Sequence, residues 1–359
     1  MTRRGTDRLF DLTQDDQGID ELPRKIRVGV ALVLLAVALI FVTAVLGISV
    51  YAGRIAMQFD KKGVPPIKVN LAVDYMSVSF KSIDGSTNLR GWLFSAPTAR
   101  DSIVIMVHGM GENRFQFGED TLDIVESLIA NNFCVLTFDL RNSGDSDTGI
   151  PTFGLRERDD VLGAIAYVNS LQYSNIVVYG FSSGANAAIM AASKPRADLR
   201  ANPSVTQAIL DTLSGSVDAL ILDTPITDVS EHLMQILIER DFVLPEFPFK
   251  HTIPLAVNLF INGDVSNIDN MRSFYDFIPR HVLLMYGNRD DTAETAGIQE
   301  MYEEYHNLAA GKISMWADPN AGFMESFSTS RQEYLEKLSD FLNLAFPAEI
   351  ATTEENSIE

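Results

Sequence analysis

The feature that most restricts the fold is an uninterrupted apolar segment near the N-terminus. Residues 28–52 contain no charged side chain, and a helix needs about 20 apolar residues to cross the hydrocarbon core of a bilayer. We therefore predict a transmembrane helix over 28–52, a polar segment over 1–27 and a linker over 53–71. A cleaved signal peptide is the competing interpretation, with Val50 and Ala52 as the small residues before the cleavage point. The apolar core of a signal peptide is usually only about 7–15 residues long.

Basic residues flank this segment on both sides, but they are grouped most tightly before it, as Arg24, Lys25 and Arg27. Such a group tends to stay on the cytoplasmic side of a membrane. The sequence therefore predicts a single-pass protein of the cell membrane, in contact with the lipid bilayer through residues 28–52. Its N-terminus would be cytoplasmic and the domain that follows would lie outside.

Charge and cysteine content exclude several other functions. The net charge is −20, and all of it falls after residue 52 because residues 1–27 sum to zero. A domain this acidic repels phosphate backbones, so nucleic acid is not an expected partner. Cys134 is the single cysteine, and the chain has no paired-cysteine or HExxH motif, so we expect no disulfide, no metal and no cofactor. The acidic tail over 347–359 is expected to be disordered.

After the linker, short apolar runs alternate with helical periods. Two runs, Val73–Phe80 and Leu89–Ser95, flank the turn-forming pair Asp84-Gly85 and predict an antiparallel hairpin. Continuous apolar runs of four to six residues are typical of strands that are buried on both faces. The predicted strands are Ile103–Val107, Phe133–Phe138, Ile176–Tyr179, Ala219–Leu222, Val282–Tyr286 and Ile313–Trp316. The alternation predicts an α/β domain over 72–346, with a mostly parallel sheet flanked by helices.

Two stretches interrupt this alternation. Residues 194–216 lengthen the connection before the Ala219 strand. Residues 226–275 form a longer insertion rich in Leu, Phe, Ile and Pro, and an insertion of this size usually packs over the strand ends as a cap. Near the end of the domain, Ser330 and Glu333 form a capping-box pattern at the start of a helix.

The clearest chemical signal is Gly180-Phe181-Ser182-Ser183-Gly184, which directly follows a predicted strand and precedes a helix-prone run. A G-x-S-x-G pattern in this setting is a nucleophile elbow. The turn is so tight that side chains at either end would clash, which explains both glycines. The strained turn presents the Ser182 hydroxyl at the sheet edge, and the helix N-terminus behind it favours developing negative charge.

A second motif follows the Ile103–Val107 strand and reads His108-Gly109-Met110-Gly111-Glu112-Asn113-Arg114. In this position the backbone N–H of Met110 would join that of Ser183 in an oxyanion hole. His108 is better explained as a structural loop residue than as a base. A dinucleotide-binding loop is the rival interpretation, but Arg114 stands where its third glycine belongs.

A third motif, Tyr286-Gly287-Asn288-Arg289-Asp290-Asp291, ends the next-to-last predicted strand. A carboxylate that follows the nucleophile in chain order, at the carboxyl end of a strand, is where a triad acid belongs. Asp290 is the better candidate and Asp291 the reserve. A surface turn or a helix cap is the alternative explanation of these residues.

Taken together, these motifs occur in the order in which the α/β-hydrolase superfamily has them. The matching segments are His108–Arg114, Phe138–Ser146, Gly154 with Glu157 and Asp160, Gly180–Gly184, and Gly287–Asp290. From about residue 72 to 346 the chain resembles this superfamily, in particular its serine-peptidase-like and esterase-like branch. The resemblance implies an α/β-hydrolase fold with a cap. It also implies Ser182 as nucleophile and Asp290 as acid.

One position departs from the family pattern. The family's catalytic histidine follows the last strand, typically after a glycine, and here Phe323 follows Gly322 at that place. Phenylalanine has no lone pair and cannot accept the serine proton. Removing the base from a serine protease costs about 10⁶ in turnover. The oxyanion hole and substrate binding alone still accelerate the reaction about 10³–10⁴-fold over the reaction in water.

Two functions therefore remain open. The first is a serine hydrolase that cleaves an ester, a thioester or a small peptide bond, impaired unless another base replaces the missing one. His251 in the cap insertion is the candidate for that role, and His306 on a predicted scaffold helix is a weaker one. The second is an inactive pseudo-hydrolase that binds an acyl or lipid-like ligand or a protein partner at the membrane.

Overall fold

The computed structural model describes residues 23–66, 74–97, 101–193, 205–206, 213, 216–265, 268, 274–289 and 293–347. The predicted N-terminal segment and acidic tail lie almost wholly outside these residues. So do part of the linker and most of the long connection over 194–216. Asp290 and Asp291, the two candidates for the triad acid, also lie outside the described residues.

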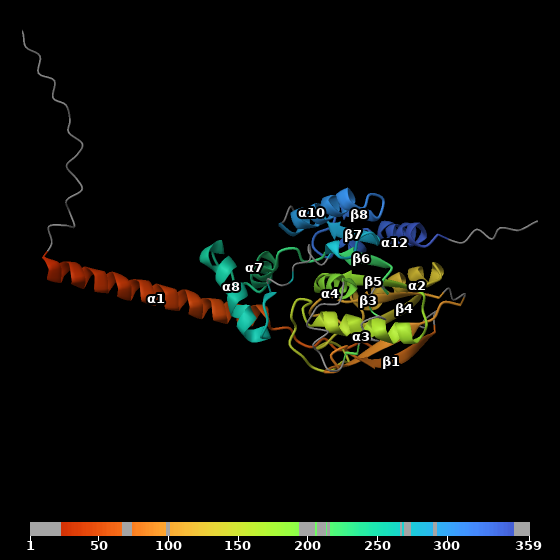
Figure 1. The fold of residues 1–359 in the computed structure, drawn as a ribbon, viewed down its shortest axis with the longest axis horizontal. Coiled ribbons are helices and arrows are strands. Elements are labelled where there is room, and N and C mark those ends of the chain that lie inside the picture. The colour runs from red at the N-terminus through yellow and green to blue at the C-terminus, as the bar shows by residue number, and fades with distance from the viewer. Residues whose placement is uncertain are drawn as a thin grey trace, which may run out of the picture.

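A single long helix precedes the α/β domain. Helix α1 runs from Arg24 to Ala56, so it includes the whole predicted apolar segment and four residues of the predicted linker. Among the described residues it is the one helix long and apolar enough to cross a membrane. Figure 1 shows α1 extending away from the domain, with α7 and α8 between its C-terminal end and the sheet.

The domain is built on one eight-stranded sheet in the order β1-β2-β4-β3-β5-β6-β7-β8. The β1–β2 and β2–β4 pairs are antiparallel, and all the others are parallel. Both the hairpin and the six other strands are found where the sequence predicts them, but β8, at the edge of the sheet, is only partly buried. The strands are β1 Tyr75–Lys81, β2 Asn88–Phe94, β3 Ser102–Val107, β4 Cys134–Asp139, β5 Asn175–Phe181, β6 Ala219–Asp223, β7 His281–Gly287 and β8 Ile313–Asp318.

Helices cover both faces of the sheet, as predicted for an α/β fold. Every residue of β3, β4 and β6 is buried, because helices pack on either side of them. The helices are α2 Thr121–Ala130, α3 Glu157–Ser170, α4 Ser183–Ala192, α7 Val229–Glu239, α8 Glu246–Ile261, α10 Ala293–Leu308, α11 Ser326–Thr329 and α12 Arg331–Ala345, with a short 3₁₀ turn η1 at Gly118–Asp120.

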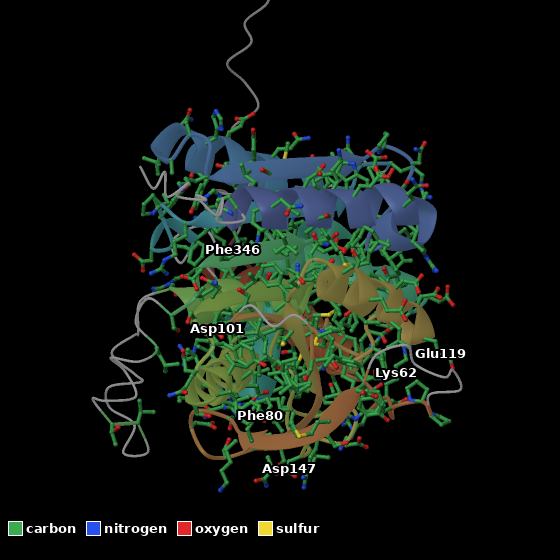
Figure 2. The ribbon with its side chains drawn as sticks, turned by 90° about the vertical axis from the view of Figure 1, so that its right-hand side faces the viewer. Lys62, Phe80, Asp101, Glu119, Asp147 and Phe346 are labelled. Carbon is green, nitrogen blue, oxygen red and sulfur yellow. The ribbon has the colours of Figure 1, made fainter. Side chains whose placement is uncertain are left out.

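The two layers differ in the helices that form them. One core cluster joins the sheet to α3, α4 and α10, and the other joins its opposite face to α2 and α12. Figure 2 views the domain from the side away from α1, with Phe80 and Asp147 near the β1–β2 edge. Asp147 belongs there because its carboxylate accepts a hydrogen bond from the Asn88 N–H at 2.8 Å.

The start of α12 shows one local error of the sequence prediction. The helix begins at Arg331, as expected, but Ser330 makes no side-chain cap. Glu333 instead accepts a hydrogen bond at 3.0 Å from the indole N–H of Trp316, a residue of β8. The Glu333 carboxylate is thus bonded to Trp316 and does not form the capping box with Ser330.

The segment between β6 and β7 carries α7 and α8 and forms a third apolar cluster. This cluster includes Leu233 and Leu237 of α7, Val257 of α8, and Ala52 and Ala56 of α1. The insertion therefore packs on the end of α1 as well as on the domain. We call α7, α8 and the loop that joins them the cap.

A buried carboxyl group lies at the carboxyl end of β6. The Asp223 carboxylate accepts hydrogen bonds from the hydroxyls of Tyr334, at 2.6 Å, and Thr224, at 2.8 Å. Tyr334 also bonds to the Tyr179 hydroxyl, so α12 is linked to β5 and β6 through polar groups inside the core. Burial raises the pKa of Asp223 to about 6.

This pKa makes a pH-dependent contribution to stability. The folded-state pKa of Asp223 lies above its ordinary value of 3.8. The native state therefore keeps a proton that the unfolded chain has already lost. Asp223 should therefore lower the free energy of unfolding by about 3 kcal/mol as the pH rises from about 4 to about 6. Asp223→Asn should lose this contribution, because asparagine does not titrate, and should keep that of Asp160, whose pKa burial also raises to about 6.

Thermal denaturation of the full-length protein across this pH range checks the expectation. Asp74→Asn, at an exposed position, is the control and should follow the wild-type pH dependence. Identical pH dependence in wild type and Asp223→Asn would show that Asp223 does not titrate in this way.

Candidate functional site

The turn between β5 and α4 has the strained geometry that the G-x-S-x-G pattern predicts. Ser182 is the single residue between the strand and the helix, and its φ of 49° and ψ of −121° fall in a region that costs a non-glycine residue about 1–3 kcal/mol. A Cβ atom at Gly180 would lie 2.5 Å from the Ala185 Cα, and one at Gly184 would lie 2.3 Å from the His108 carbonyl oxygen. Both glycines are therefore required by close backbone contacts.

The backbone of Ser182 is fixed on both sides. Its N–H donates to the Asp223 carbonyl at 2.9 Å, and its carbonyl accepts from the Ala185 N–H at 2.9 Å. The residue as a whole is 9% exposed. Among the described residues, none forms a hydrogen bond with the Ser182 hydroxyl, so the hydroxyl is held at the sheet edge without a proton acceptor.

The loop after β3 passes directly beside this serine. A Cβ atom at Gly109 would lie 3.3 Å from the Phe181 carbonyl oxygen and 3.4 Å from the Ser182 Cβ, so the loop lies at van der Waals distance from the elbow. The next amide, the N–H of Met110, donates to the Ser183 hydroxyl at 2.8 Å. Ser183 is the first residue of α4, so its own N–H has no acceptor within the helix. The two amides predicted for the oxyanion hole thus come together, and a substrate oxygen would have to displace the Ser183 hydroxyl.

His108 has a structural role in this loop. Its Nδ1 donates to the Gly109 carbonyl at 2.8 Å, and its Nε2 accepts from the Leu140 N–H at 3.0 Å. Burial lowers the pKa of His108, which favours the neutral ring that these two contacts require. With both ring nitrogens used, His108 joins the loops after β3 and β4 and has no lone pair left for Ser182.

Buried ion pairs hold the loops around the elbow. Arg114 pairs with the Asp139 carboxylate, which also accepts from the Asp145 N–H at 2.8 Å. Arg141 bonds to Asp160 through Nε at 3.0 Å and Nη2 at 2.7 Å. Removing one partner of such a buried pair typically costs about 3–5 kcal/mol. These residues of the family pattern therefore support the site, and Arg141 also borders a small cavity that Met110 and Ser183 line.

Glu157 holds a third loop, which contains Thr152 and Gly154, against the elbow. Its carboxylate accepts from the Thr152 N–H and from the Gly154 N–H, both at 2.9 Å. Gly154 has a φ of +104°, and a Cβ atom there would lie 3.0 Å from the Ser183 carbonyl oxygen. The glycine and the glutamate of the family pattern thus bring this loop against the first turn of α4.

The loops after β7 and β8 are in direct backbone contact. The Arg289 N–H donates to the Ala321 carbonyl at 2.9 Å. A Cβ atom at Gly287 would lie 2.0 Å from the Gly322 carbonyl oxygen. Arg289 also pairs with Glu325 at 2.8 Å. The segment that leads to Asp290 and the segment that carries Phe323 are therefore adjacent, although Asp290 itself lies outside the described residues.

Phe323 is 43% exposed, and its ring forms one wall of a cavity of about 210 Å³. We call this space the Phe323 cavity. Its other walls come from the ends of β6 and β7, from α10 and from the cap helix α7. Residues around it include Thr224, His232, Ile236, Gly287 and Ile298. The residue that the sequence analysis predicts at the place of the family histidine is thus an aromatic ring beside a partly apolar space.

His232 is a residue of this site that the sequence analysis did not select. It lies on α7, is 8% exposed, and its ring centroid is 5.8 Å from that of Phe323 and 6.2 Å from that of Phe153. Phe153 in turn borders a smaller cavity beside Met110 and Ser183. The cap thus places an imidazole in contact with both the Phe323 ring and the Phe153 ring. No spacing motif in the sequence connects His232 to these residues, because the contact depends on how the insertion folds back.

The two histidines that the sequence suggests as replacement bases lie away from Ser182 and Phe323. His251 is exposed on α8 and lines neither of these cavities. His306 is exposed near the end of α10, where its ring stacks on Tyr302 at 5.5 Å. Within the described part of the chain, no group of three or more His, Cys, Asp or Glu side chains could hold a metal ion.

Comparisons with known proteins agree with this architecture. An esterase of Pyrococcus furiosus is 21% identical and has a TM-score of 0.58, with 80% of this chain and 98% of the esterase covered. An alpha/beta hydrolase of Penicillium sp. sh18 is 16% identical, has a TM-score of 0.52, and is matched over 75% of this chain and 98% of its own length. A thermophilic esterase of Thermogutta terrifontis is 16% identical with a TM-score of 0.52, over 75% of this chain and 91% of the esterase.

At these identities the solved structures show a shared fold alone. No curated protein matches the chain. The family model described as the alpha/beta hydrolase family matches residues 104–322, which is more than half of the chain. This chain therefore belongs to the alpha/beta hydrolase family.

Proposed function

We propose that the protein is a membrane-anchored serine hydrolase that cleaves an ester, a thioester or a small peptide bond through an acyl-enzyme at Ser182. The observation that carries the proposal is the strained turn at Ser182, with the Met110 amide beside it. A turn of this kind costs free energy and persists where the surrounding structure imposes it. The esterases with the same fold make an ester the first substrate class to test.

In the proposed reaction the Ser182 oxygen attacks the carbonyl carbon of the substrate. The carbonyl oxygen becomes an oxyanion and receives hydrogen bonds from the N–H groups of Met110 and Ser183. The serine proton passes to a base and then to the leaving alcohol, thiol or amine. Water, activated by the same base, attacks the acyl-enzyme and releases the acid. Asp290 is the proposed partner that orients the base.

We propose His232 as that base. Support comes from its contact with the Phe323 ring, which occupies the family histidine's place, and from its position between that ring and Phe153. The cap would then supply from outside the sheet the imidazole that the loop after β8 lacks. Closure of the cap over a bound substrate would bring the ring toward the Ser182 hydroxyl. His251, with its exposed side chain, has less support as the replacement base.

We propose that the mature protein keeps the apolar helix as its membrane anchor, with the N-terminus in the cytoplasm and the domain outside. Support for retention comes from the buried face at the end of α1. Ser49, Ala52, Gly53 and Ala56 are buried in the contact with the domain. Cleavage after Ala52 would remove the first two of these and expose the apolar residues of α8 that cover them. A cleaved signal peptide has no need of such a face.

An active-site probe tests the nucleophile. A fluorophosphonate should label the full-length, detergent-solubilised protein and should not label Ser182→Ala. Ser183→Ala is the matched control, because it removes the neighbouring hydroxyl and leaves Ser182 in place. It should label at least as fast as wild type, since the Met110 amide is then released from the Ser183 hydroxyl. Equal labelling of wild type and Ser182→Ala would remove the serine hydrolase proposal.

Kinetics of the same labelling reaction test the base. His232→Gln should slow labelling by about 10²–10⁴-fold, the usual contribution of a general base. His251→Gln should label at the wild-type rate. The assignment of His232 fails if its variant labels as fast as wild type, and a loss confined to His251→Gln would transfer the role to that residue.

Phe323 favours a second function, in which the domain binds an acyl or lipid-like ligand, or a protein partner, without turning it over. Phe323→His distinguishes the two functions, measured as hydrolysis of a soluble p-nitrophenyl ester with Ser182→Ala/Phe323→His as control. For a binding protein the wild type is inactive, and the variant gains activity by orders of magnitude, because the missing base costs about 10⁶. Robust wild-type turnover that Ser182→Ala abolishes would exclude the binding-only function.

A further inference from the structure

The cap is packed against the last two turns of α1. The Ser49 hydroxyl lies 2.7 Å from the Thr252 hydroxyl of α8. A Cβ atom at Gly53 would lie 3.4 Å from the Val257 side chain. Small residues on α1 thus allow α8 to lie close to it, as they do where helices meet inside a membrane.

Two further contacts fix the cap to the region where α1 ends. Arg240, just after α7, donates to the carbonyl of Ile55 and to that of Gln58, the latter at 2.7 Å. The ring of Phe242 lies 5.8 Å from the ring of Tyr51. The position of the cap relative to α1 therefore rests on several contacts of different chemistry.

The length of α1 sets the depth of these contacts in a bilayer. A span of about 20 residues crosses about 30 Å of hydrocarbon. If the span begins at Val28, where the uncharged stretch begins, it reaches the far side of the hydrocarbon at about residue 47. Residues 49–56 then lie at the level of the lipid headgroups, and α8 packs against these residues. Figure 1 shows α8 beside this end of α1.

Four large apolar side chains of the cap are exposed in this region. Val243 is 74% exposed, Phe247 80%, Leu255 64% and Leu259 76%. Val243 directly follows Phe242, which contacts α1. Leu255 and Leu259 lie one turn apart and alternate with the α8 residues that face α1. We call these four residues the apolar cap surface. Large apolar side chains that a cap exposes to this extent are candidates for a binding face.

We propose that the apolar cap surface inserts into the headgroup region of the bilayer beside α1, so that the site takes acyl esters resident in the membrane. The substrate part of this inference rests on the proposed hydrolase function. The cap helix α7 joins the two parts, because His232 and Ile236 of this helix border the Phe323 cavity. An acyl chain that leaves the bilayer beneath the cap would reach this cavity without crossing water.

The segment that follows α1 also keeps the loop that carries Met110 close to the membrane. The Lys62 carbonyl accepts from the Gly144 N–H at 3.1 Å, and the Gly63 carbonyl accepts from the Asn113 side chain at 3.0 Å. The segment is thus fastened to the loops after β3 and β4 within a few residues of the end of α1.

The single cysteine makes the membrane contact measurable. Cys134 is buried, so one introduced cysteine can be labelled alone. Leu255→Cys and Leu259→Cys would carry an environment-sensitive fluorophore in the full chain, reconstituted in phosphatidylcholine vesicles. Leu308→Cys on α10 is the matched control, because Leu308 is also 64% exposed but lies outside the cap.

At positions 255 and 259 the emission should shift to the blue. Nitroxide-labelled phosphatidylcholine should quench about half of it, because interfacial helices lie within about 5–10 Å of the acyl boundary. The label at position 308 should show neither change. Labels at 255 and 259 that behave like the one at 308 would overturn the membrane contact. A blue shift without lipid quenching would overturn it too, in favour of contact with a second copy.

A separate assay tests the substrate class. Leu255→Glu/Leu259→Glu should cut hydrolysis of a vesicle-embedded p-nitrophenyl palmitate by about tenfold or more, because charge opposes interfacial insertion. It should leave hydrolysis of p-nitrophenyl acetate in water unchanged, and Leu308→Glu should affect neither. Equal rates of the double variant and wild type on the embedded ester would refute a membrane-resident substrate. If wild type hydrolyses neither ester, the hydrolase function fails, while the fluorescence result still decides the membrane contact.

Discussion

The close approach of α4 to the loop after β3 is the constraint on which the rest of the site depends. The backbone at Gly184 lies so near the His108 carbonyl that no side chain fits between them. This contact brings the Met110 amide to the first turn of α4, and it leaves Ser182 in its strained conformation at the sheet edge. The buried pairs formed by Arg114 and Arg141 hold the surrounding loops in the positions that this approach requires.

The cap and the end of α1 form one structural unit. The third apolar cluster contains residues from both, so part of α1 belongs to the interior of the folded protein. The same cap supplies His232 to the space beside Phe323. In the proposed mechanism the cap connects the bilayer to the reacting groups and supplies the base that Phe323 cannot provide.

Much of the fold follows from the sequence, because it depends on local patterns. The six buried strands appear as continuous apolar runs, and the elbow appears as two glycines around a serine after a strand. The Asp84-Gly85 turn identifies the hairpin, and the uncharged stretch over 28–52 identifies the long helix. The capping box predicted at Ser330 does not form, because the Glu333 carboxylate accepts a hydrogen bond from the Trp316 indole, which lies in another element.

The sequence by itself determined the α/β class, the apolar helix and the serine turn, since each rests on residues close together in the chain. It also predicts that Phe323 stands at the place of the family histidine. Only the tertiary structure decided what lies beside that ring. His232 is about 90 residues away in the chain and meets Phe323 because α7 folds back over the strand ends. The packing of α8 on α1 likewise joins segments about 200 residues apart, and no local pattern encodes a contact over such a distance.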